Sequence, residues 1–301
     1  MKFFDFGEVI DTNTEYAIFG IPWDYLTSKE TPNSALAPGK IRRASNDLAL
    51  TTELGFKIPD LNVVDLGDVT IENETDVQSN IDLIINFINN IYSQKKEIIP
   101  VMIGGDHFCS FPVIKAVGDN FDNQDEFGVL IFDAHLDFYK EWDKGKFSHA
   151  TIAHRVFDLD FITNKNLVIA GTRDIDIPEM MNADEENIFH LDAYRLLEEG
   201  LNESIERIIE YFKYSKIKSL YVSIDIDALD PSIAPGTGFA IPGGYSYREM
   251  WKTLREITKS FKIIGFDLVE VAPNLDIKSK LTSNLAAKLI VELISFIKYN
   301  K

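Results

Sequence analysis

The sequence predicts an α/β fold: a single three-layer domain spanning residues 1–301, with helices on both faces of a mostly parallel central sheet of about eight strands. Three observations predict it. Short, continuously apolar runs alternate with helix-like stretches almost throughout the chain. Runs that are apolar at every position are typical of strands buried on both faces of a parallel sheet. No Pro/Gly/Ser-rich linker, low-complexity segment or repeat interrupts the alternation, so no domain boundary is expected.

The strand candidates share short length and enrichment in β-branched or aromatic residues. They are Tyr16–Ile21, Val63–Leu66, Ile98–Ile103, Val129–Phe132, Leu167–Ala170, Ile188–Leu191, Leu220–Ile224 and Ile263–Leu268. Helices are expected between them, where apolar residues recur every three or four positions. Ile81–Lys95 and Glu203–Tyr214 show this spacing, and the mostly apolar stretch Leu281–Tyr299 is expected to close the domain.

The composition excludes some classes of partner. The formal net charge of −18 argues against binding to nucleic acid or to an anionic membrane surface, because both reward basic proteins. The same charge would favour a cationic small molecule, although an acidic surface that only keeps the protein soluble explains it equally well. No apolar run approaches the roughly 18 residues of a membrane helix. Cys109 is the only cysteine, so intramolecular disulfides are impossible and a cytoplasmic location is expected.

Three acidic and histidine-containing motifs follow predicted strands. GGDH ends at His107, DAHLD spans Asp133–Asp137, and SIDIDALDP contains Asp225 and Asp227. Ligands of open α/β sheets sit beyond the carboxyl ends of the strands, which is where each motif falls. Four aspartates gathered in one place would repel one another, so the folded chain would need cations there. Two divalent ions would match the four negative charges and would activate water for hydrolysis.

The spacing within the motifs adds to this prediction. In an extended chain Asp133, His135 and Asp137 would share one face, and so would Asp225 and Asp227. An oxygen-rich set of ligands suits Mn²⁺ better than a structural zinc ion. Any one of these motifs alone is also typical of a helix cap or a loop turn. All three behind buried strands of one domain predict a two-metal centre.

The same residues carry a family resemblance. GGDH, DAHLD and SIDIDALDPSIAPGTG resemble the three signatures of the ureohydrolase family, which includes arginases, agmatinases and formiminoglutamases. The similarity extends over nearly the whole chain. The further matching segments are Ile18–Pro22, APGKIRRAS at Ala37–Ser45, LGDV at Leu66–Val69, AGTRD at Ala170–Asp174 and VEVAP at Val269–Pro273.

Carried over position by position, the resemblance implies two Mn²⁺ ions per subunit, bridged by hydroxide. The implied ligands are His107 and Asp137 for the first ion, His135 and Asp227 for the second, and Asp133 and Asp225 for both. Asp137 would also accept a hydrogen bond from the hydroxide. Coordination lowers the pKa of the bridging water and so supplies a nucleophile near neutral pH.

Two further site residues lie outside the three motifs. By resemblance, His149 stands at the mouth of the site, where it binds substrate and shuttles a proton to the leaving amine. Taken alone, it could equally be a surface histidine at the start of a helix over Ala150–Phe157, with Ser148 as its cap. His154 on that helix and His190 in a strand are expected to be structural.

Glu270 follows the last predicted strand. By resemblance it binds the planar guanidinium of the substrate through a two-pronged hydrogen bond. The alternative for such a carboxylate is an ordinary structural ion pair at the sheet edge. Cys109 follows His107 closely, but no base is identifiable for it, so a packed thiol is expected.

Among ureohydrolases, the loops resemble those of agmatinases. The segment Tyr139–Thr151 lacks the Asn/Ser-rich stretch by which arginases bind an amino-acid head group, whereas Phe111–Val117 and Pro235–Gly238 with Pro242–Gly244 look agmatinase-like. The resemblance therefore implies a small cationic guanidino substrate, agmatine, hydrolysed to putrescine and urea. Arginase, guanidinobutyrase and formiminoglutamase are the alternatives on the same scaffold, and a non-catalytic ureohydrolase-like partner is the alternative outside the enzymes.

Two departures from the family pattern lie near the expected site. They are Phe108–Cys109, in place of a Ser-containing continuation, and Phe239–Ala240, in place of Thr-Pro. Neither removes an expected ligand, but both bear on tail selectivity or metal affinity. The family also implies a homo-oligomer, a trimer or hexamer.

Overall fold

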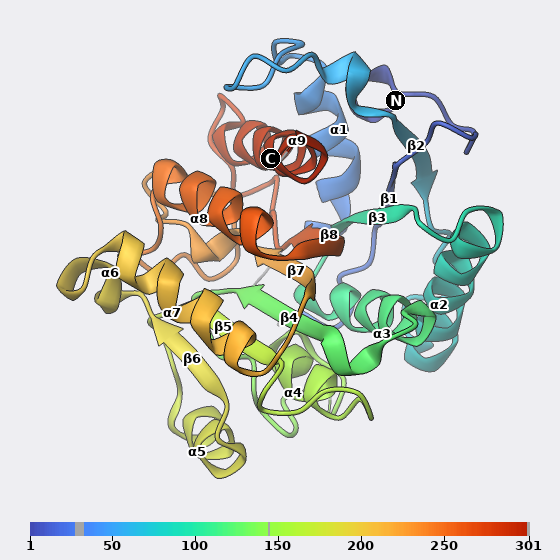
Figure 1. The fold of residues 1–301 in the computed structure, drawn as a ribbon. Helices are drawn as coiled ribbons and strands as arrows, with labels where there is room; N and C mark the ends of the chain where they lie inside the picture. Colours follow the sequence, from blue (N-terminus) through green and yellow to red (C-terminus); the bar gives the residue numbers. More distant parts are fainter. Residues whose placement is uncertain (28–32, 144, 300–301) are drawn as a thin grey trace.

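The computed structural model describes residues 1–27, 33–143 and 145–299 and contains one eight-stranded sheet (Figure 1). Its strand order is β2-β1-β3-β8-β7-β4-β5-β6, and every neighbouring pair is parallel. The strands are β1 (Tyr16–Ile21), β2 (Val63–Asp68), β3 (Ile99–Gly104), β4 (Phe127–Phe132), β5 (Leu167–Thr172), β6 (Phe189–Asp192), β7 (Ser219–Asp225) and β8 (Lys262–Val269). The prediction of an α/β fold with a parallel sheet of about eight strands is confirmed.

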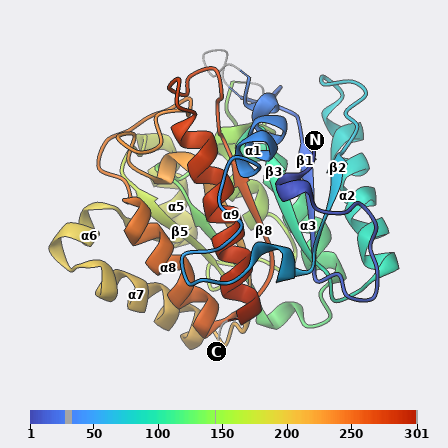
Figure 2. The same cartoon turned by 90° about the horizontal axis from the view of Figure 1, so that it is seen from above.

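Helices cover both faces of this sheet. They are α1 (Ala37–Ser45), α2 (Val77–Gln94), α3 (Ser110–Asn120), α4 (Ile152–Phe157), α5 (Ile177–Glu186), α6 (Tyr194–Glu198), α7 (Leu201–Tyr214), α8 (Tyr247–Ser260) and α9 (Leu281–Tyr299). Helices α1, α9, α8 and α7 pack in that order over one face, and α2, α3 and α4 pack over the other (Figures 1 and 2). Each layer encloses its own apolar core against the sheet.

The sequence periodicity places the helices well but misses some of their ends. Helix α9 has the predicted bounds, whereas α2 begins at Val77, one turn before the predicted start, because the Asp76 side chain accepts a hydrogen bond from the backbone N–H of Ser79 at 3.2 Å. The helix predicted over Ala150–Phe157 divides into a 3-10 turn at His149–Thr151 and the short helix α4.

A buried ion pair joins the start of the chain to the edge of the sheet. Arg42 of α1 donates to both carboxylate oxygens of Asp65 in β2, at 2.7 and 3.0 Å, and both side chains are buried. Asp65 also accepts the backbone N–H of Phe3 at 2.7 Å. The bidentate geometry satisfies two charges that would otherwise be buried without a partner.

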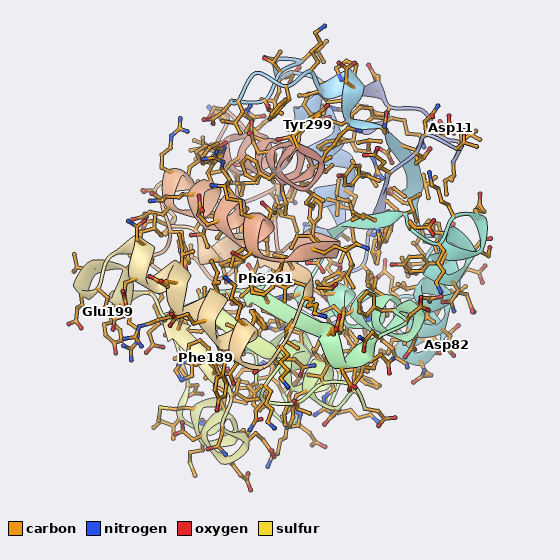
Figure 3. The ribbon with its side chains drawn as sticks, in the orientation of Figure 1. Asp11, Asp82, Phe189, Glu199, Phe261 and Tyr299 are labelled. Atoms are coloured by element: carbon orange, nitrogen blue, oxygen red, sulfur yellow. The ribbon has the colours of Figure 1, made fainter. Side chains whose placement is uncertain are left out.

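Charged and apolar side chains differ in where they lie. Asp11 and Asp82 are exposed and project from the periphery, whereas Phe261 is buried and lies near the centre of the view (Figure 3). No helix in residues 1–27, 33–143 or 145–299 is long and apolar enough to cross a membrane.

Candidate metal centre

Four adjacent strands in the middle of the sheet deliver the predicted site residues to one edge. The order β3-β8-β7-β4 places His107, Glu270, Asp225 and Asp133 next to one another, because each follows or ends one of these strands. The carboxyl ends of neighbouring parallel strands meet at one edge, so residues distant in sequence converge there.

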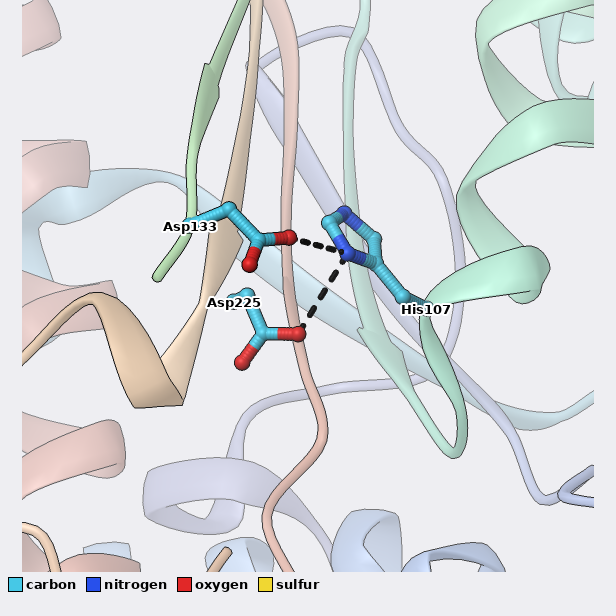
Figure 4. Close-up of side chains that lie close together, drawn as sticks. All are labelled: His107, Asp133 and Asp225. Atoms are coloured by element: carbon cyan, nitrogen blue, oxygen red, sulfur yellow. Dashed lines mark ion pairs between the residues drawn. The ribbon is translucent and has the colours of Figure 1, made fainter. Parts of the chain in front are cut away.

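A first group of possible ligands surrounds the Nδ1 atom of His107. This atom lies 2.9 Å from Asp133 Oδ2 and 3.3 Å from Asp225 Oδ2 (Figure 4). The Oδ2 atom of Asp137 lies 3.3 Å from the same nitrogen. All four side chains are buried, so one imidazole nitrogen and three carboxylates face a common point away from bulk water.

A second group lies beside the first and shares Asp133 with it. The Nδ1 atom of His135 is 3.3 Å from Asp133 Oδ1 and 3.1 Å from Asp227 Oδ2. The two oxygens of Asp133 thus face different groups. The triads His107–Asp133–Asp225 and Asp133–His135–Asp227 each have ligand atoms within 4.8 Å of one another, which is the arrangement two adjacent cations need.

Backbone hydrogen bonds fix how these carboxylates point. The Oδ1 atom of Asp225 accepts the N–H of Asp227 at 2.8 Å, and Oδ1 of Asp227 accepts the N–H of Ala134 at 3.0 Å. The remaining oxygen of each carboxylate is the one that faces a histidine. Asp225 therefore presents its Oδ2 to the first group, and its bridging of both ions stays a prediction.

The chemistry of this donor set fits divalent cations. His107 Nδ1 and Asp133 Oδ2 are buried and have no hydrogen-bond partner, although they lie 2.9 Å apart. Burial, followed by the charge of Asp133, raises the pKa of Asp137 to about 8, and burial with Asp227 and Asp133 raises the pKa of Asp225 well above its usual value. Cations placed between these groups would pair with the orphaned atoms and relieve the repulsion.

The structure corrects the reason for this convergence. Extended-chain alternation was expected to align Asp133, His135 and Asp137, but Asp137 has a left-handed backbone with φ of 50°. Asp227 lies in a 3-10 turn, Ile226–Ala228, and not in a continued strand. The aspartates meet because the chain turns sharply at the strand ends, a backbone strain often concentrated at functional sites.

Glu270 lies beside the first group without a cationic partner. It also has a positive φ, 62°, and is only 6% exposed. Its Oε1 accepts the backbone N–H of His107 at 2.9 Å, and no Lys or Arg of the described residues lies within ion-pair distance of it. Burial, followed by the charge of Asp106, raises the pKa of Glu270 well above its usual value. An ordinary structural ion pair is thus not what holds this carboxylate.

His149 lines a cavity of about 370 Å³, whose wall also includes His135 of the second group. The Nδ1 atom of His149 lies 3.0 Å from the carbonyl oxygen of Leu26. Because a carbonyl oxygen only accepts, Nδ1 carries the proton of this hydrogen bond, and Nε2 is the ring nitrogen left for proton transfer. Burial lowers the pKa of His149. Ser148 forms the capping box of the turn that carries His149, so the predicted cap is present at a residue that also lines the cavity, and its role at the mouth of the site stays a prediction.

Phe239, a departure from the family pattern, lies at the same cavity. Its ring is nearly parallel to that of His149 with centroids 6.0 Å apart, and it meets the ring of His135 edge-on at 5.9 Å. The side chain of Phe239 lines the cavity and is 40% exposed, so a bound ligand could contact its ring. Phe108 is instead buried in the core, against Trp23 and other rings behind the site.

The structure adds cavity residues that the sequence had not singled out. Beside His135, Asp137, His149 and Phe239, the described lining comprises Tyr139, Trp142, Ala150, Asp174, Ile175, Asp176 and Glu179. Asp174 closes the AGTRD segment, so its place in a matching motif was an available signal. Tyr139 and Trp142 come from a loop, where no periodicity marks a residue as lining a site.

The residues expected to be structural are not members of the two groups. The Sγ atom of Cys109 is buried 3.2 Å from the carbonyl oxygen of Trp23, and burial raises its pKa well above the usual value, as for a packed thiol. His190 Nδ1 pairs with Asp192 at 2.9 Å in β6, and His154 lies on α4 near Asp158.

Comparison with known proteins gives a consistent picture. A family model described as the arginase family matches residues 14–295. The agmatinase of Bacillus subtilis (strain 168) is 33% identical over 284 residues, 93% of this chain and 91% of that protein. A mitochondrial arginase of Medicago truncatula is 32% identical over 286 residues, 92% of this chain and 80% of that protein.

The solved structures agree with the sequence comparisons. Formimidoylglutamase from Bacillus subtilis matches with a TM-score of 0.89 and 27% identity, over 99% of this chain and 92% of that one. The family match covers all six predicted metal ligands, His149 and Glu270. The chain therefore belongs to the arginase family and is a ureohydrolase, a hydrolase of linear amidine C–N bonds.

Proposed function

We propose that this ureohydrolase is an agmatinase, which hydrolyses agmatine and water to putrescine and urea. The observation that carries the proposal is the charge of the cavity beside the predicted metal centre. Besides the predicted metal ligand Asp137, its described lining contains three acidic side chains, Asp174, Asp176 and Glu179, and no Lys or Arg. A substrate tail with a positive charge and no carboxylate suits that lining.

The competing substrates differ in this respect. Arginine, guanidinobutyrate and formiminoglutamate all carry a carboxylate, which the acidic lining would repel and for which it offers no cationic partner. Agmatine ends in an ammonium group on an apolar chain. The aromatic walls Tyr139, Trp142 and Phe239 can pack against that chain and attract its cation.

The two groups of ligands would hold the metal ions, for which we propose Mn²⁺. His107 and Asp137 would bind one ion and His135 and Asp227 the other, and both ions would share Asp133 and Asp225. Two bound cations would lower the pKa of a water molecule between them and so supply the nucleophile.

The other residues would position the substrate and move a proton. Glu270, held by the backbone of His107, would bind the guanidinium through a charge-assisted hydrogen bond and keep its carbon facing the nucleophile. His149 would protonate the leaving amine through Nε2 as the C–N bond to the alkyl chain breaks. The nitrogen bonded to the alkyl chain takes that proton and becomes an amine of putrescine. The guanidinium carbon, now bonded to the oxygen of the nucleophile, leaves in urea.

A substrate panel tests the proposal. The purified protein with Mn²⁺ is assayed for urea release from agmatine, arginine and guanidinobutyrate and for formamide release from formiminoglutamate. We expect the highest kcat/KM with agmatine and no turnover by Asp133→Asn. A preference for arginine would refute the agmatinase proposal and leave the ureohydrolase family intact, and it is the main alternative because the arginase relative is almost equally similar.

The panel also separates enzymes from a non-catalytic partner, because such a partner would release no product when purified alone. The predicted cytoplasmic location and the trimeric or hexameric assembly stay predictions. Fractionation of cells and light scattering of the purified protein would test them.

A further inference from the structure

One fully buried carboxylate has no part in the chemistry proposed above. Asp267 lies in the middle of β8 with 0% of its surface exposed. No Lys or Arg among the described residues lies within ion-pair distance of it. A buried carboxylate without a cation is unfavourable unless hydrogen bonds compensate it, and such groups tend to be kept for function.

Asp267 ends a chain of hydrogen bonds that begins at the metal centre. His107 Nε2, the ring nitrogen turned away from the aspartates, is 3.1 Å from Ser223 Oγ. Ser223 Oγ lies 2.7 Å from Asp267 Oδ1, and Tyr221 Oη donates to Asp267 Oδ2 at 2.6 Å. All four side chains are buried, so water does not compete for these bonds.

The sheet fixes the geometry of this chain. Ser223 of β7 and Asp267 of β8 are directly opposed in the parallel register. Along β7, every second residue projects to the same face of the sheet. Tyr221, Ser223 and Asp225 are spaced in this way and share one face. The hydrogen bonds are therefore built into two central strands and not into a loop.

The chemistry of the groups sets the direction of each proton. An ionised carboxylate only accepts, so Ser223 and Tyr221 both donate to Asp267. Ser110 Oγ also lies 3.3 Å from Ser223 Oγ, but the contact with Asp267 is shorter, so the single Ser223 proton is assigned there. The Ser223 oxygen then offers a lone pair to His107 Nε2, which must carry the imidazole proton. Nδ1 is left with its lone pair facing the aspartates.

We propose that Asp267 is a positioning residue for the metal centre: acting through Ser223, it holds His107 in the tautomer and orientation in which Nδ1 is a ready ligand. The proposal rests on the predicted metal centre and adds two residues outside the ligand set. Partners of this kind change metal affinity by about 10- to 100-fold in other sites.

The test measures metal binding directly. Ser223→Ala and Asp267→Asn are compared with the wild type by Mn²⁺ titration against a competing chelator, which resolves the affinity and number of bound ions. In both variants we expect one of the two ions to bind about 10- to 100-fold more weakly and the other to bind with little change. The reason is that His107 belongs to one of the two groups of predicted ligands and not to the other.

The matched control is Glu292→Gln. Glu292 is another fully buried carboxylate, hydrogen-bonded by Glu53 N–H at 2.8 Å and paired with Lys288 on α9. This variant should lose stability and keep both Mn²⁺ affinities.

The outcomes separate the two proposals. Wild-type affinity for both ions in Ser223→Ala would overturn the positioning role. If Asp267→Asn does not fold, the result for Ser223→Ala alone tests the proposal. An equal loss at both ions, matched by Glu292→Gln, would also overturn it. A wild type that binds no Mn²⁺ would overturn the metal centre as well. A wild type that binds two ions but hydrolyses no guanidino compound would refute the proposed function alone.

Discussion

Replacing Glu270 by Gln should lower activity without lowering the stability of the protein. Gln keeps the shape of the side chain and a carbonyl oxygen that can accept the N–H of His107, now 2.9 Å from Oε1. It removes the negative charge that would bind a guanidinium. A hydrogen bond to a charged group contributes roughly 1.5–3 kcal/mol, so kcat/KM should fall by about 10- to 100-fold.

The stability of the metal-free protein should not fall with it. Glu270 is 6% exposed and has no cationic partner among the described residues, so a single hydrogen bond is all that compensates the burial of its charge. A neutral amide avoids that penalty, which for buried polar groups is about 1–3 kcal/mol. We expect the Tm to stay level or to rise by about 2 °C.

The assay pairs initial rates of urea release with thermal unfolding and Mn²⁺ titration of the same preparations. Glu292→Gln is the matched control. Because Glu292 pairs with Lys288, this variant should be less stable than the wild type, with no change in kcat/KM. A clear drop in Tm or in metal content for Glu270→Gln would assign Glu270 a structural role. Unchanged kcat/KM would remove it from substrate binding.

Three further outcomes follow from the contacts described above. Asp133→Asn should abolish tight binding of both Mn²⁺ ions in a chelator titration, since its two oxygens face both groups, whereas Asp174→Asn, at the cavity wall, should keep both ions. His149→Asn should lower kcat for urea release by about 10²- to 10⁴-fold while leaving two bound ions, and loss of an ion would contradict its proton-transfer role. Arg42→Ala should reduce the free energy of unfolding by about 3–5 kcal/mol in urea denaturation, because it strands the buried Asp65 carboxylate; a change below 1 kcal/mol would contradict that.

The sequence predicted the sheet well because the strands are buried on both faces. A run such as that of β4 is apolar at every position, so few other structures could accommodate it. The residues that follow such strands were equally predictable as members of one site. The position of each predicted ligand was not predictable. Asp137 has a left-handed backbone and Asp227 lies in a 3-10 turn, and such local φ/ψ choices leave no periodic signal in the sequence.

The cavity walls and the buried polar chain were harder still to predict. Trp142 and Phe239 line the cavity from loops, whose course depends on the packed structure beneath them. Ser223 and Asp267 each look like one polar residue inside an apolar strand. Only the pairing of β7 with β8, which is a long-range contact, shows that they belong together.

The place of β8 in the sheet also has a consequence for how the protein is made. Among the described strands, β8 comes last along the chain, yet it lies between β3 and β7 and pairs with both. Until it has been synthesised, the segment bearing His107 and the segment bearing the four aspartates belong to two separate sets of strands. A nascent chain that ends before Lys262 lacks the strand that joins these two sets, so we expect the predicted first metal site to form only after β8 has been made.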